Sequence, residues 1–469
     1  MSLIARLPPW VRVLLVAFAL LAALRALALV LHRPLLAFAN NYDQIRYTAC
    51  LDLAPWRPGV AADAGNPQAP LSRYAFQPLP AGTCIWTSDL LFTAPVALAW
   101  TVSERLGARA IHSVQRMAEW RLLLWFAFAA WMTVALLRAG RADVALAHLG
   151  WLALFGTDPA NLLYFATFYA EAAAISGFFL CVGASVVALV RPTRGALALA
   201  AIGAIVLAAS KFQHLLLPVL LGVALLFGAG RGGRKAALAV LAGALLGLGV
   251  QVADVVRDPP MAHGVNTVNR ADFVLTVLLP ETSDRAHVAA ALELDDACLA
   301  YAGKSVYAMP QFVDRICTRV NDWPRTLPWR LLIADPPALL RALGHVPRYL
   351  LPWIPGLGLV EGGTFTPLPR TIPSWSSLFG ESRAMATGLL ALPWLVFGVC
   401  LARRAPAPAR GFALMCATGS SAVAVVALFG DGDVEYAKHA QLAIDFSLAS
   451  LGVAFAALAR RGLPEELRA

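Results

Sequence analysis

A polar cluster that could carry out acid–base chemistry follows directly after the first long apolar run of the chain. It contains Asn41, Asp43, Gln44 and Arg46. A carboxylate held at the surface of a bilayer can take a proton from a hydroxyl group while a lipid-anchored molecule reaches the same place from the side. Asp43 is therefore the first candidate for a general base. The structural alternative is that Asp43 caps a helix or pairs with Arg46.

Asp158 and Glu171 bracket a second polar segment, which lies between two apolar runs. The Asp158–Pro159 pair is typical of a turn or a helix start. Glu171 opens an apolar run, where a charge usually faces a water-filled cavity; a carboxylate stabilised by the helix dipole is the alternative. The aromatic residues between the two carboxylates are expected to form an interfacial belt, although sugars also stack on such rings. They are Tyr164, Phe165, Phe168 and Tyr169.

Two basic clusters complete the candidate chemistry, one in a tight turn between apolar runs and one at the start of the last run. A lysine with a neighbouring imidazole supplies the charge and the hydrogen bonds that a phosphate or pyrophosphate on a lipid carrier needs. Ordinary contact with lipid headgroups by snorkelling side chains is the alternative. The clusters contain Lys211, Gln213, His214, Glu435, Lys438 and His439.

The sequence Asp431-Gly432-Asp433 is the nearest approach to a metal site. Two carboxylates without further oxygen ligands are a weak signal, and the chain has no histidine-rich or cysteine-rich ligand spacing. We therefore assign no metal ligands and expect no required cofactor, with a divalent cation only weakly supported. The sequence also lacks a glycine-rich phosphate loop, so no site for a nucleotide-driven reaction is expected.

The composition indicates that most of these residues sit in or next to a lipid bilayer. Hydrophobic residues make up 59% of the 469 residues and charged residues 14%, with a mean hydropathy of +0.66. A water-soluble domain with this balance would expose large apolar patches. The net charge of +10 does not indicate nucleic acid as a partner, because the arginines stand singly or in pairs between apolar runs.

The apolar runs predict an all-α polytopic membrane protein of about ten transmembrane helices. The first run, 10–31, is too long for a signal-peptide core and is expected to be retained. The others lie at 118–138, 142–156, 171–190, 195–210, 213–229, 235–255, 384–402, 411–429 and 440–459.

The basic loops between these runs predict the orientation, since positive residues flanking a helix resist translocation. They alternate along the chain and are assigned to the cytoplasm with both termini: Arg138 and Arg141, Arg191 and Arg194, Arg231 to Lys235, Arg403 to Arg410, and Arg460 and Arg461. The alternation holds only if 90–102 does not span. We therefore expect 89–104 to be a helix at the membrane surface; a short spanning helix is the alternative.

Two long extracytoplasmic loops follow from this orientation, 33–117 and 257–383. They divide the chain into an N-terminal transmembrane module, 1–256, the second long loop, and the C-terminal transmembrane helices, 384–469. We expect the second loop to form short surface helices that cap a membrane cavity.

The seven cysteines separate by position. Cys181, Cys400 and Cys416 fall inside apolar runs, where a thiol packs as a small hydrophobic group. The other four are expected to form one disulfide within each long loop, as an oxidising compartment would produce; four unrelated thiols are the alternative. The predicted pairs are Cys50 with Cys84 and Cys298 with Cys317.

This pattern resembles the GT-C class of membrane glycosyltransferases, and more narrowly the bacterial glycan-biosynthesis hexose transferases of that class. The resemblance covers most of the chain. It rests on the long first loop, on the stretch 269–294, and on Asp43, Asp158, Phe168, Tyr169 and Glu171. It implies a GT-C-like architecture in a bacterial cytoplasmic (inner) membrane.

The resemblance also implies an activity, the inverting transfer of a hexose or pentose from a polyprenyl-phosphate donor to a glycan or glycoprotein acceptor on the periplasmic, extracytoplasmic face. Asp43 would act as the general base, and Asp158 and Glu171 would shape the acceptor or donor-sugar site. The residues implied to hold the carrier phosphate and to contact the substrates are Asn41, Arg46, Tyr169, Lys211, Gln213, His214, Glu435, Lys438 and His439. Asp43 departs from the pattern because no acidic residue stands beside it.

Two rival functions stay open at the level of sequence. A membrane transporter or flippase of a lipid-linked saccharide also needs about ten helices, but it usually places ionisable groups at mid-bilayer in repeated, broken helices. Apart from Arg25, Gln251 and Asp254, the apolar runs hold few polar groups. An O-antigen ligase or polymerase would use a carrier bearing an oligosaccharide on a pyrophosphate, and the sequence does not distinguish it from a transferase that uses a monophosphate carrier.

Overall fold

The computed structural model describes residues 7–38, 42–56, 72–108, 110–257, 259–324, 326–354, 368–380, 382–432 and 434–464. Within these ranges the chain is an all-α polytopic membrane protein with one very small sheet, as the apolar runs predicted. Seven of its helical stretches are long and apolar enough to cross a membrane. They contain α1 (Pro9–Val30), α4 (Gln115–Arg138), α7 (Glu171–Val190), α9 (Leu217–Arg257), α18 (Arg383–Ala402), α19 (Ala407–Asp431) and α21 (Gln441–Gly462).

The stretch α9 is really two helices. It has 41 residues, which at 1.5 Å per residue is about 60 Å, twice the hydrocarbon thickness of a bilayer. Its backbone leaves helical geometry at Gly230, where φ is 56° and ψ is −144°. The shorter apolar helices α5 (Ala142–Trp151) and α8 (Arg194–Ala208) join the bundle. With α9 divided at Gly230, each of the ten predicted apolar runs is helical in the structure.

Close approach of helices through glycine holds the centre of the bundle together. α8 packs against α7 on one side and α9 on the other. A Cβ atom at Gly203 of α8 would lie 2.3 Å from the backbone nitrogen of Cys181, and one at Gly177 of α7 would lie 2.7 Å from the backbone nitrogen of Leu207. The backbone at Cys181 and at Leu207 is part of a packed helix and could not move away without shifting that helix. These two positions therefore set the spacing of α7 and α8, as small residues do in membrane bundles.

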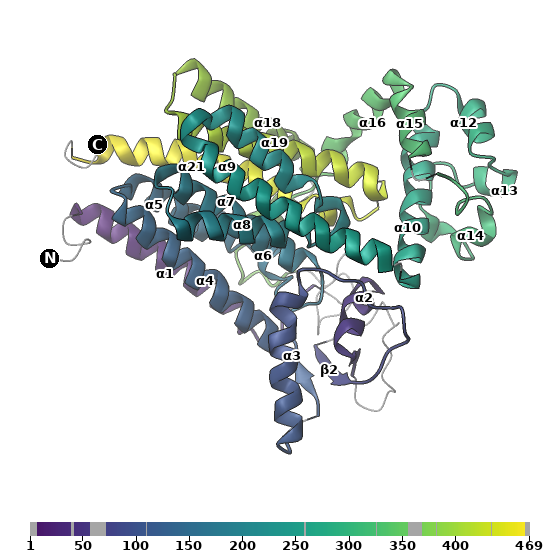
Figure 1. Cartoon of the computed structure of the whole chain (residues 1–469), viewed down its shortest axis with the longest axis horizontal. Coiled ribbons are helices and arrows are strands. Elements are labelled where there is room, and N and C mark those ends of the chain that lie inside the picture. Colours follow the sequence, from purple (N-terminus) through teal and green to yellow (C-terminus); the bar gives the residue numbers. More distant parts are fainter. Residues whose placement is uncertain are drawn as a thin grey trace.

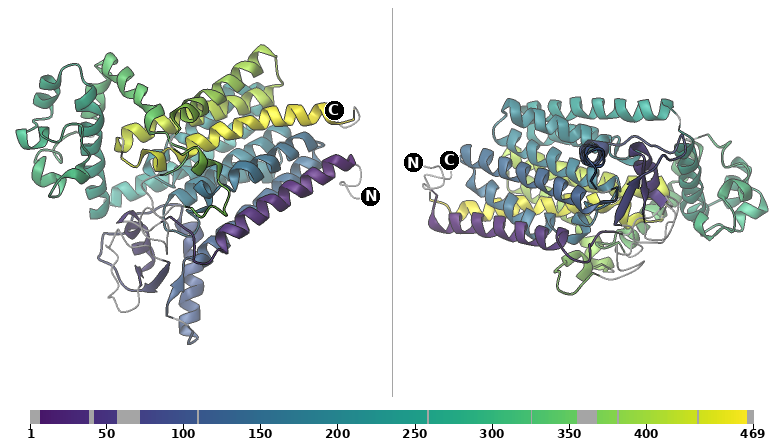
Figure 2. Two further views of the ribbon diagram at one scale, coloured as in Figure 1. Left: turned by 180° about the vertical axis from the view of Figure 1, so that it is seen from behind. Right: turned by 90° about the horizontal axis from the view of Figure 1, so that it is seen from below.

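The two ends of the bundle differ in what they carry. Figure 1 shows both termini at one end, and the helices of the two long loops at the other. The views in Figure 2 show the same separation from behind and from below. Helix α3 (Leu90–Arg105) runs across the direction of the bundle in Figure 1. The predicted helix at 89–104 is therefore present, and its 16 residues are fewer than a membrane span usually needs.

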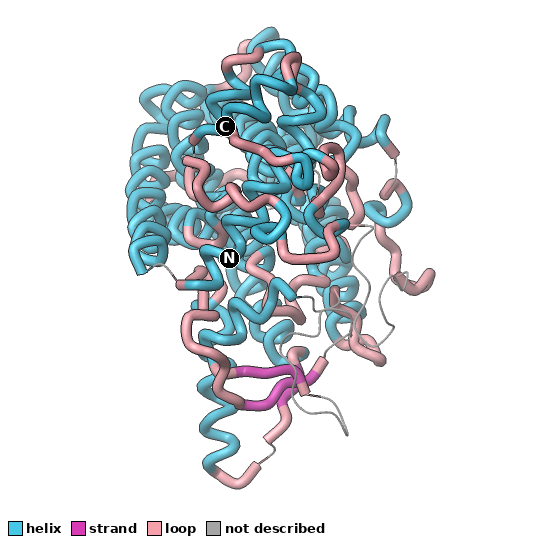
Figure 3. Tube along the Cα trace, turned by 90° about the vertical axis from the view of Figure 1, so that its right-hand side faces the viewer, coloured by secondary structure: helices cyan, strands magenta, loops and turns pink. Residues whose placement is uncertain are grey.

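The first long loop contains a small sheet that the sequence did not predict (Figure 3). Its strands β1 (Leu53–Pro55), β2 (Arg73–Phe76) and β3 (His112–Ser113) pair antiparallel in that order. A disulfide joins Cys50 and Cys84, whose Cα atoms are 4.7 Å apart. The other helical elements of this loop are η2 (Tyr42–Gln44), α2 (Ile45–Thr48) and η3 (Ala49–Leu51).

The second long loop folds into short helices that project from the end of the bundle (Figure 1). Its disulfide joins Cys298 and Cys317, so both predicted bridges are confirmed, and the three remaining cysteines are free and buried as expected. The helical elements are α10 (Pro260–Asp272), η6 (Phe273–Leu278), α11 (Leu279–Glu281), α12 (Arg285–Ala291), α13 (Asp296–Leu299), η7 (Val306–Ala308), α14 (Val313–Ile316), α15 (Leu327–Ile333), α16 (Pro336–Tyr349) and α17 (Trp375–Leu378).

Four further short elements connect the membrane helices. They are the π-helical turn η4 (Leu152–Gly156), α6 (Pro159–Leu162), the 3₁₀ turn η5 (Phe212–His214) and α20 (Tyr436–His439). The two basic clusters of the sequence lie at η5 and α20: Lys211 directly precedes η5, and Glu435 directly precedes α20.

Candidate functional site

Asp43 lies between two cations. Its Oδ2 accepts a hydrogen bond from Nζ of Lys438 at 2.6 Å, and its Oδ1 accepts one from the guanidinium of Arg46, one helical turn along the chain. Arg46 is held in place by a second bond from its Nε to the Asp43 carbonyl, 3.0 Å long. The predicted pairing of Asp43 with Arg46 is therefore present, and Asp43 also binds Lys438, which is distant in the sequence.

Lys438 is the central cation of the site. Its side chain is fully buried, and it reaches Glu435 on the preceding turn as well as Asp43. Its Nζ also lies 5.1 Å from the ring centroid of Tyr169, a distance at which the ring face attracts a cation. Glu435 has left-handed backbone angles, φ 47° and ψ 25°. Such angles are strained for a residue with a long side chain, and strain of this kind concentrates at functional sites.

A second ion pair lies beside the first. Nζ of Lys211 is 2.5 Å from Oε1 of Glu171, at the start of α7, and 3.0 Å from Nδ1 of His439. The side chain of Gln213 donates to the carbonyl of His439 at 3.2 Å. His439 follows Lys438 directly, so the two pairs belong to one group of side chains. We call this group, Asp43, Arg46, Tyr169, Glu171, Lys211, Glu435, Lys438 and His439, the charged cluster.

The titration behaviour of the charged cluster is set by its burial and its mixed charges. Burial alone would raise the pKa of the Asp43 carboxyl, but Arg46 and Lys438 outweigh it and hold that pKa well below its usual range. Burial would lower the pKa of Lys438, yet Asp43 and Glu435 raise it well above normal. For Lys211 burial prevails over Glu171 and lowers the pKa. Burial and the two lysines lower the pKa of His439 well below its usual value.

The charged cluster can therefore hold an anion and move a proton. Its three acidic side chains are paired with its three basic ones, beside the imidazole of His439. A phosphate that entered would find donors on Lys438, Arg46 and Lys211, and charge-assisted bonds of this kind are strong. In the described part of the chain no group of three or more His, Cys, Asp or Glu side chains could hold a metal ion; the side chains of Asp431 and Asp433 lie outside that part.

Most of the residues that the sequence singled out meet in this one place. Asn41 lies outside the described residues. His214 turns instead to the hydroxyl of Ser210, 3.0 Å from its Nδ1. Asp158 lies apart from this group and contacts Ser374, Trp375 and Arg25 instead. The residues that do meet are the eight of the charged cluster together with Gln213.

A comparison with protein-family models gives one match, over residues 80–319, to the YfdI N-terminal transmembrane domain. The matched segment is 319 − 80 + 1 = 240 of the 469 residues, just over half of the chain. This chain belongs to the YfdI N-terminal transmembrane domain family. The match includes Glu171 and Lys211 and stops short of Asp43 and Lys438 on either side. No curated protein and no solved structure matches the chain.

In this YfdI family member Asp158 joins the second long loop to the bundle. It caps α6 through the amide of Ala160, 3.1 Å away. Its two oxygens accept from the Ser374 hydroxyl and the Trp375 amide, both at 3.1 Å, and Arg25 of α1 lies 3.6 Å away. Burial raises the pKa of this carboxyl even though hydrogen bonds and Arg25 oppose it. The observed contacts are those of a structural joint.

The aromatic segment before Glu171 does not form the interfacial belt that the sequence suggested. All four rings are at most 1% exposed. They pack on one another and on the first loop, with ring centroids 4.7 to 5.8 Å apart in the pairs Phe38–Tyr164, Tyr74–Phe168 and Tyr164–Tyr169. The prediction was wrong because the first loop covers these rings, and a run of aromatic residues does not indicate which surface they face.

Sequence reasoning also missed Arg121, which holds the aromatic segment in place. Arg121 of α4 is 1% exposed and binds both oxygens of Asp89 at 2.7 Å. The same guanidinium donates to the carbonyls of Phe165 and Thr167 at 2.6 and 2.7 Å. The side chain of Gln44 accepts from the amide of Phe168 at 2.8 Å. An arginine inside an apolar helix is the signal that could have found Arg121.

Proposed function

We propose that this protein transfers a sugar from a polyprenyl-phosphate donor to a glycan or glycoprotein acceptor, and that the charged cluster is its active site. The observation that carries the proposal is the convergence of Asp43 with Arg46, Lys211 and Lys438 from segments far apart in the sequence. A carboxylate held by two cations, with a third cation nearby on Glu171, suits a reaction in which a phosphate leaves and a hydroxyl loses a proton. The proposed architecture is of the GT-C kind.

The proposed chemistry is a single displacement. The acceptor hydroxyl oxygen attacks the anomeric carbon from the face opposite the phosphate and forms the new glycosidic bond. The bond from that carbon to the phosphate oxygen breaks, and the electron pair leaves with the phosphate. The proton of the hydroxyl passes to the Asp43 carboxylate. Attack from the opposite face inverts the configuration of the sugar.

The low pKa of Asp43 would make it a weak base, and substrate binding offers a remedy. Lys438 and Arg46 hold that carboxylate when no phosphate is present. A carrier phosphate that accepts hydrogen bonds from both cations shares them with Asp43 and weakens their hold on it. The pKa of Asp43 then rises toward its ordinary value, so the donor itself prepares the base. Asp158, with its separate contacts, has no part in this step.

The proposal places the site on the extracytoplasmic face of a bacterial inner membrane, with both termini in the cytoplasm. The loops at the end that carries the termini are rich in arginine, and such loops stay in the cytoplasm. The two disulfides belong to the opposite end, and disulfides form in an oxidising compartment.

The test is transfer of radiolabelled hexose from polyprenyl-phosphate hexoses to membrane glycans by the purified protein in liposomes. We expect Asp43→Asn to reduce the rate at least a hundredfold, because an amide cannot accept the proton. Asp52→Asn is the matched control. Asp52 lies in the same loop, is exposed and has left-handed backbone angles that asparagine tolerates. The control should keep the full rate.

Two outcomes would contradict the proposal. Full transfer by Asp43→Asn would remove Asp43 as the base. A wild-type protein that moves a lipid-linked saccharide across the liposome membrane, but transfers no sugar to any acceptor, would be a flippase.

A further inference from the structure

Two buried polar groups beside the charged cluster have no hydrogen-bond partner in the described part of the chain. They are the hydroxyl of Tyr164 and the side-chain nitrogen Nε2 of Gln44. The two residues are 0% and 2% exposed, so bulk water does not reach them. A buried donor without an acceptor is costly, and native proteins leave few of them. These two donors therefore indicate a place where a bound molecule supplies the acceptors.

The hydroxyl of Tyr164 lies at the charged cluster. Its ring packs against that of Tyr169, with centroids 5.8 Å apart, and against that of Phe38, 4.7 Å away. Burial raises the pKa of this hydroxyl well above its usual value, and Glu171 raises it further while Lys438 opposes the rise. These two charges belong to the cluster, and they act on the hydroxyl because they lie near it. The rings on either side hold the hydroxyl in this direction.

The side-chain amide of Gln44 is fixed in one orientation. Its oxygen Oε1 accepts a hydrogen bond from the backbone N–H of Phe168 at 2.8 Å. A backbone N–H can only donate, so the oxygen must face Phe168, and Nε2 is the atom without a partner. Gln44 directly follows Asp43, and Phe168 directly precedes Tyr169. The amide is therefore attached next to one residue of the cluster and bonded to the neighbour of another.

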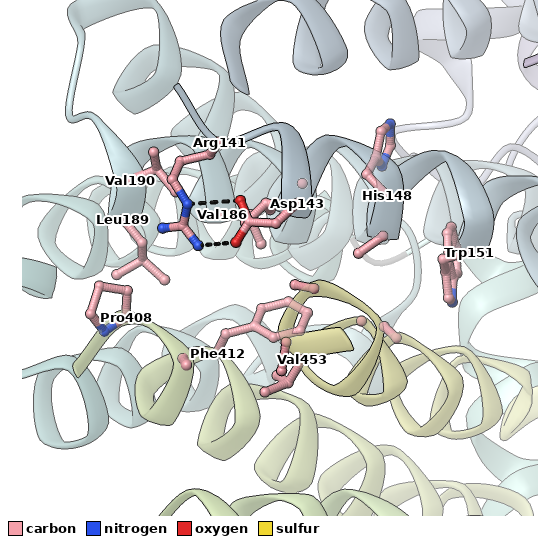
Figure 4. Close-up of a pocket in the computed structure, with 18 of the residues that line it drawn as sticks. Arg141, Asp143, His148, Trp151, Val186, Leu189, Val190, Pro408, Phe412 and Val453 are labelled. Carbon is pink, nitrogen blue, oxygen red and sulfur yellow. Dashed lines mark hydrogen bonds and ion pairs between the residues drawn. The ribbon is translucent and has the colours of Figure 1, made fainter. Parts of the chain in front are cut away.

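The missing acceptors do not belong to the large cavity of the bundle. That cavity has a volume of about 540 Å³ and lies between α5, α7, α19 and α21, at the end that carries the termini. It is mainly apolar, and Arg141 and Asp143 in its wall bind each other through hydrogen bonds of 2.9 and 2.7 Å (Figure 4). Neither Gln44 nor Tyr164 lines it. A ligand of these two donors would instead share the charged cluster.

Neutral donors and cations suit different parts of one molecule. The cations of the cluster suit a phosphate, whereas an amide and a phenol suit the hydroxyl oxygens of a sugar. In a polyprenyl-phosphate sugar, the sugar is bonded directly to the phosphate. A phosphate held by the cations would therefore bring its sugar next to the cluster, where the two donors lie.

We propose that Tyr164 and Gln44 form the subsite for the donor sugar, and that they donate hydrogen bonds to its hydroxyl groups. This inference rests on the function proposed above, since it takes the same donor. The phosphate bonds to Lys438 and Arg46, and the sugar that follows it reaches the two donors. Two bonds to the ring orient its anomeric carbon for attack. A site built in this way discriminates strongly against a ligand that lacks the hydroxyl groups.

The experiment measures binding without catalysis. The purified full chain in detergent is titrated with farnesyl phosphate and with farnesyl-phosphate glucose, galactose and mannose, followed by tryptophan fluorescence. We expect the wild type to bind at least one of the hexose conjugates about tenfold more tightly than farnesyl phosphate. Tyr164→Phe should reduce that preference to about threefold or less and leave the affinity for farnesyl phosphate unchanged. It should not lower the melting temperature, because the hydroxyl has no protein partner to lose.

Two further variants make the result specific. Gln44→Met removes the amide donor and should reduce the preference in the same way. Tyr436→Phe is the matched control, because it removes the hydroxyl of another buried tyrosine, which donates to the carbonyl of Ala424 at 2.6 Å. The control should lose thermal stability and keep the full preference for the hexose conjugate.

Three results would overturn the inference. They are a wild type that binds no hexose conjugate more tightly than farnesyl phosphate, a Tyr164→Phe variant that keeps the full preference, and a Tyr164→Phe variant that loses as much thermal stability as Tyr436→Phe.

These measurements fail or succeed separately from the proposed transfer reaction. A preference that depends on Tyr164, in a protein that transfers no sugar, would support the subsite and contradict the transferase. Sugar transfer by a protein whose preference is unchanged in Tyr164→Phe would do the reverse.

Discussion

The charged residues of the cluster are paired, and two of the pairs join distant parts of the chain. Lys438 reaches Asp43 across 395 positions of sequence, and Lys211 reaches Glu171 across 40. A buried ion pair contributes little net stability, but removing one partner leaves an isolated charge in a medium that solvates it poorly. The pairs therefore keep the cluster in one arrangement, and that arrangement is what a phosphate would have to enter.

The Lys211–Glu171 pair allows this argument to be tested. We expect Lys211→Met to lower the free energy of unfolding by about 3–5 kcal/mol, because Glu171 is left buried without its cation. The double variant Lys211→Met/Glu171→Leu should recover most of that loss. Unfolding in detergent, followed by tryptophan fluorescence, gives the four free energies of the cycle. A double variant as unstable as the single one would mean that the lysine acts through packing and not through charge.

The individual site residues were partly predictable. Asp43, Lys211 and Lys438 could be chosen because charged side chains beside apolar runs are costly and therefore informative. Their pairing could not, since it depends on which helix ends meet in space. Arg121 could have been noticed as an arginine inside an apolar helix, but its partners could not be predicted, because two of them are backbone carbonyls, which any residue supplies.

At the scale of elements, the helices were predictable and the small sheet was not. Long apolar runs place the ends of the membrane helices to within about four residues. Capping side chains mark several starts, such as Thr193 before α8 and Ser382 before α18. Strands β1, β2 and β3 have two to four residues each, which is too short for alternation to be recognised. Their pairing joins parts of the first loop that are far apart in sequence.

The element that carries Tyr169 and leads into Glu171 depends on Arg121. We expect Arg121→Lys to lower the free energy of unfolding by about 2–4 kcal/mol, because lysine cannot bind both oxygens of Asp89 and two carbonyls together. Arg116→Lys, on an exposed turn of the same helix with a surface partner in Glu119, should change it by less than about 0.5 kcal/mol. Thermal unfolding of the two variants in the same detergent makes the comparison, and equal effects would contradict the anchoring role.

For the whole molecule, the arrangement of the two ends is the main result. The disulfides, the small sheet and the charged cluster gather at one end, and the termini with the basic loops and the apolar cavity gather at the other. The alternation of basic loops predicted this separation, because basic loops stay on the cytoplasmic side and the loops between them must lie on the other side. It depended on treating 89–104 as a surface helix, and α3 runs across the bundle as that treatment requires.

The orientation of the whole molecule can be tested with single cysteines, because the native ones give a silent background. In the described chain four cysteines are bridged and three are buried and free. Ala108→Cys, just after α3, and Ala334→Cys, in the second loop, lie at exposed positions of the loop end. Gly195→Cys lies at the other end, with open space around it.

A membrane-impermeant maleimide on intact cells should label the first two variants and should reach Gly195→Cys only after permeabilisation. Labelling of Gly195→Cys alone would invert the molecule and move the charged cluster to the cytoplasmic face. Six membrane helices separate Ala108 from Ala334, namely α4, α5, α7, α8 and the two halves of α9. Protection of one of these two variants with labelling of the other would therefore mean that one of the six does not cross the membrane.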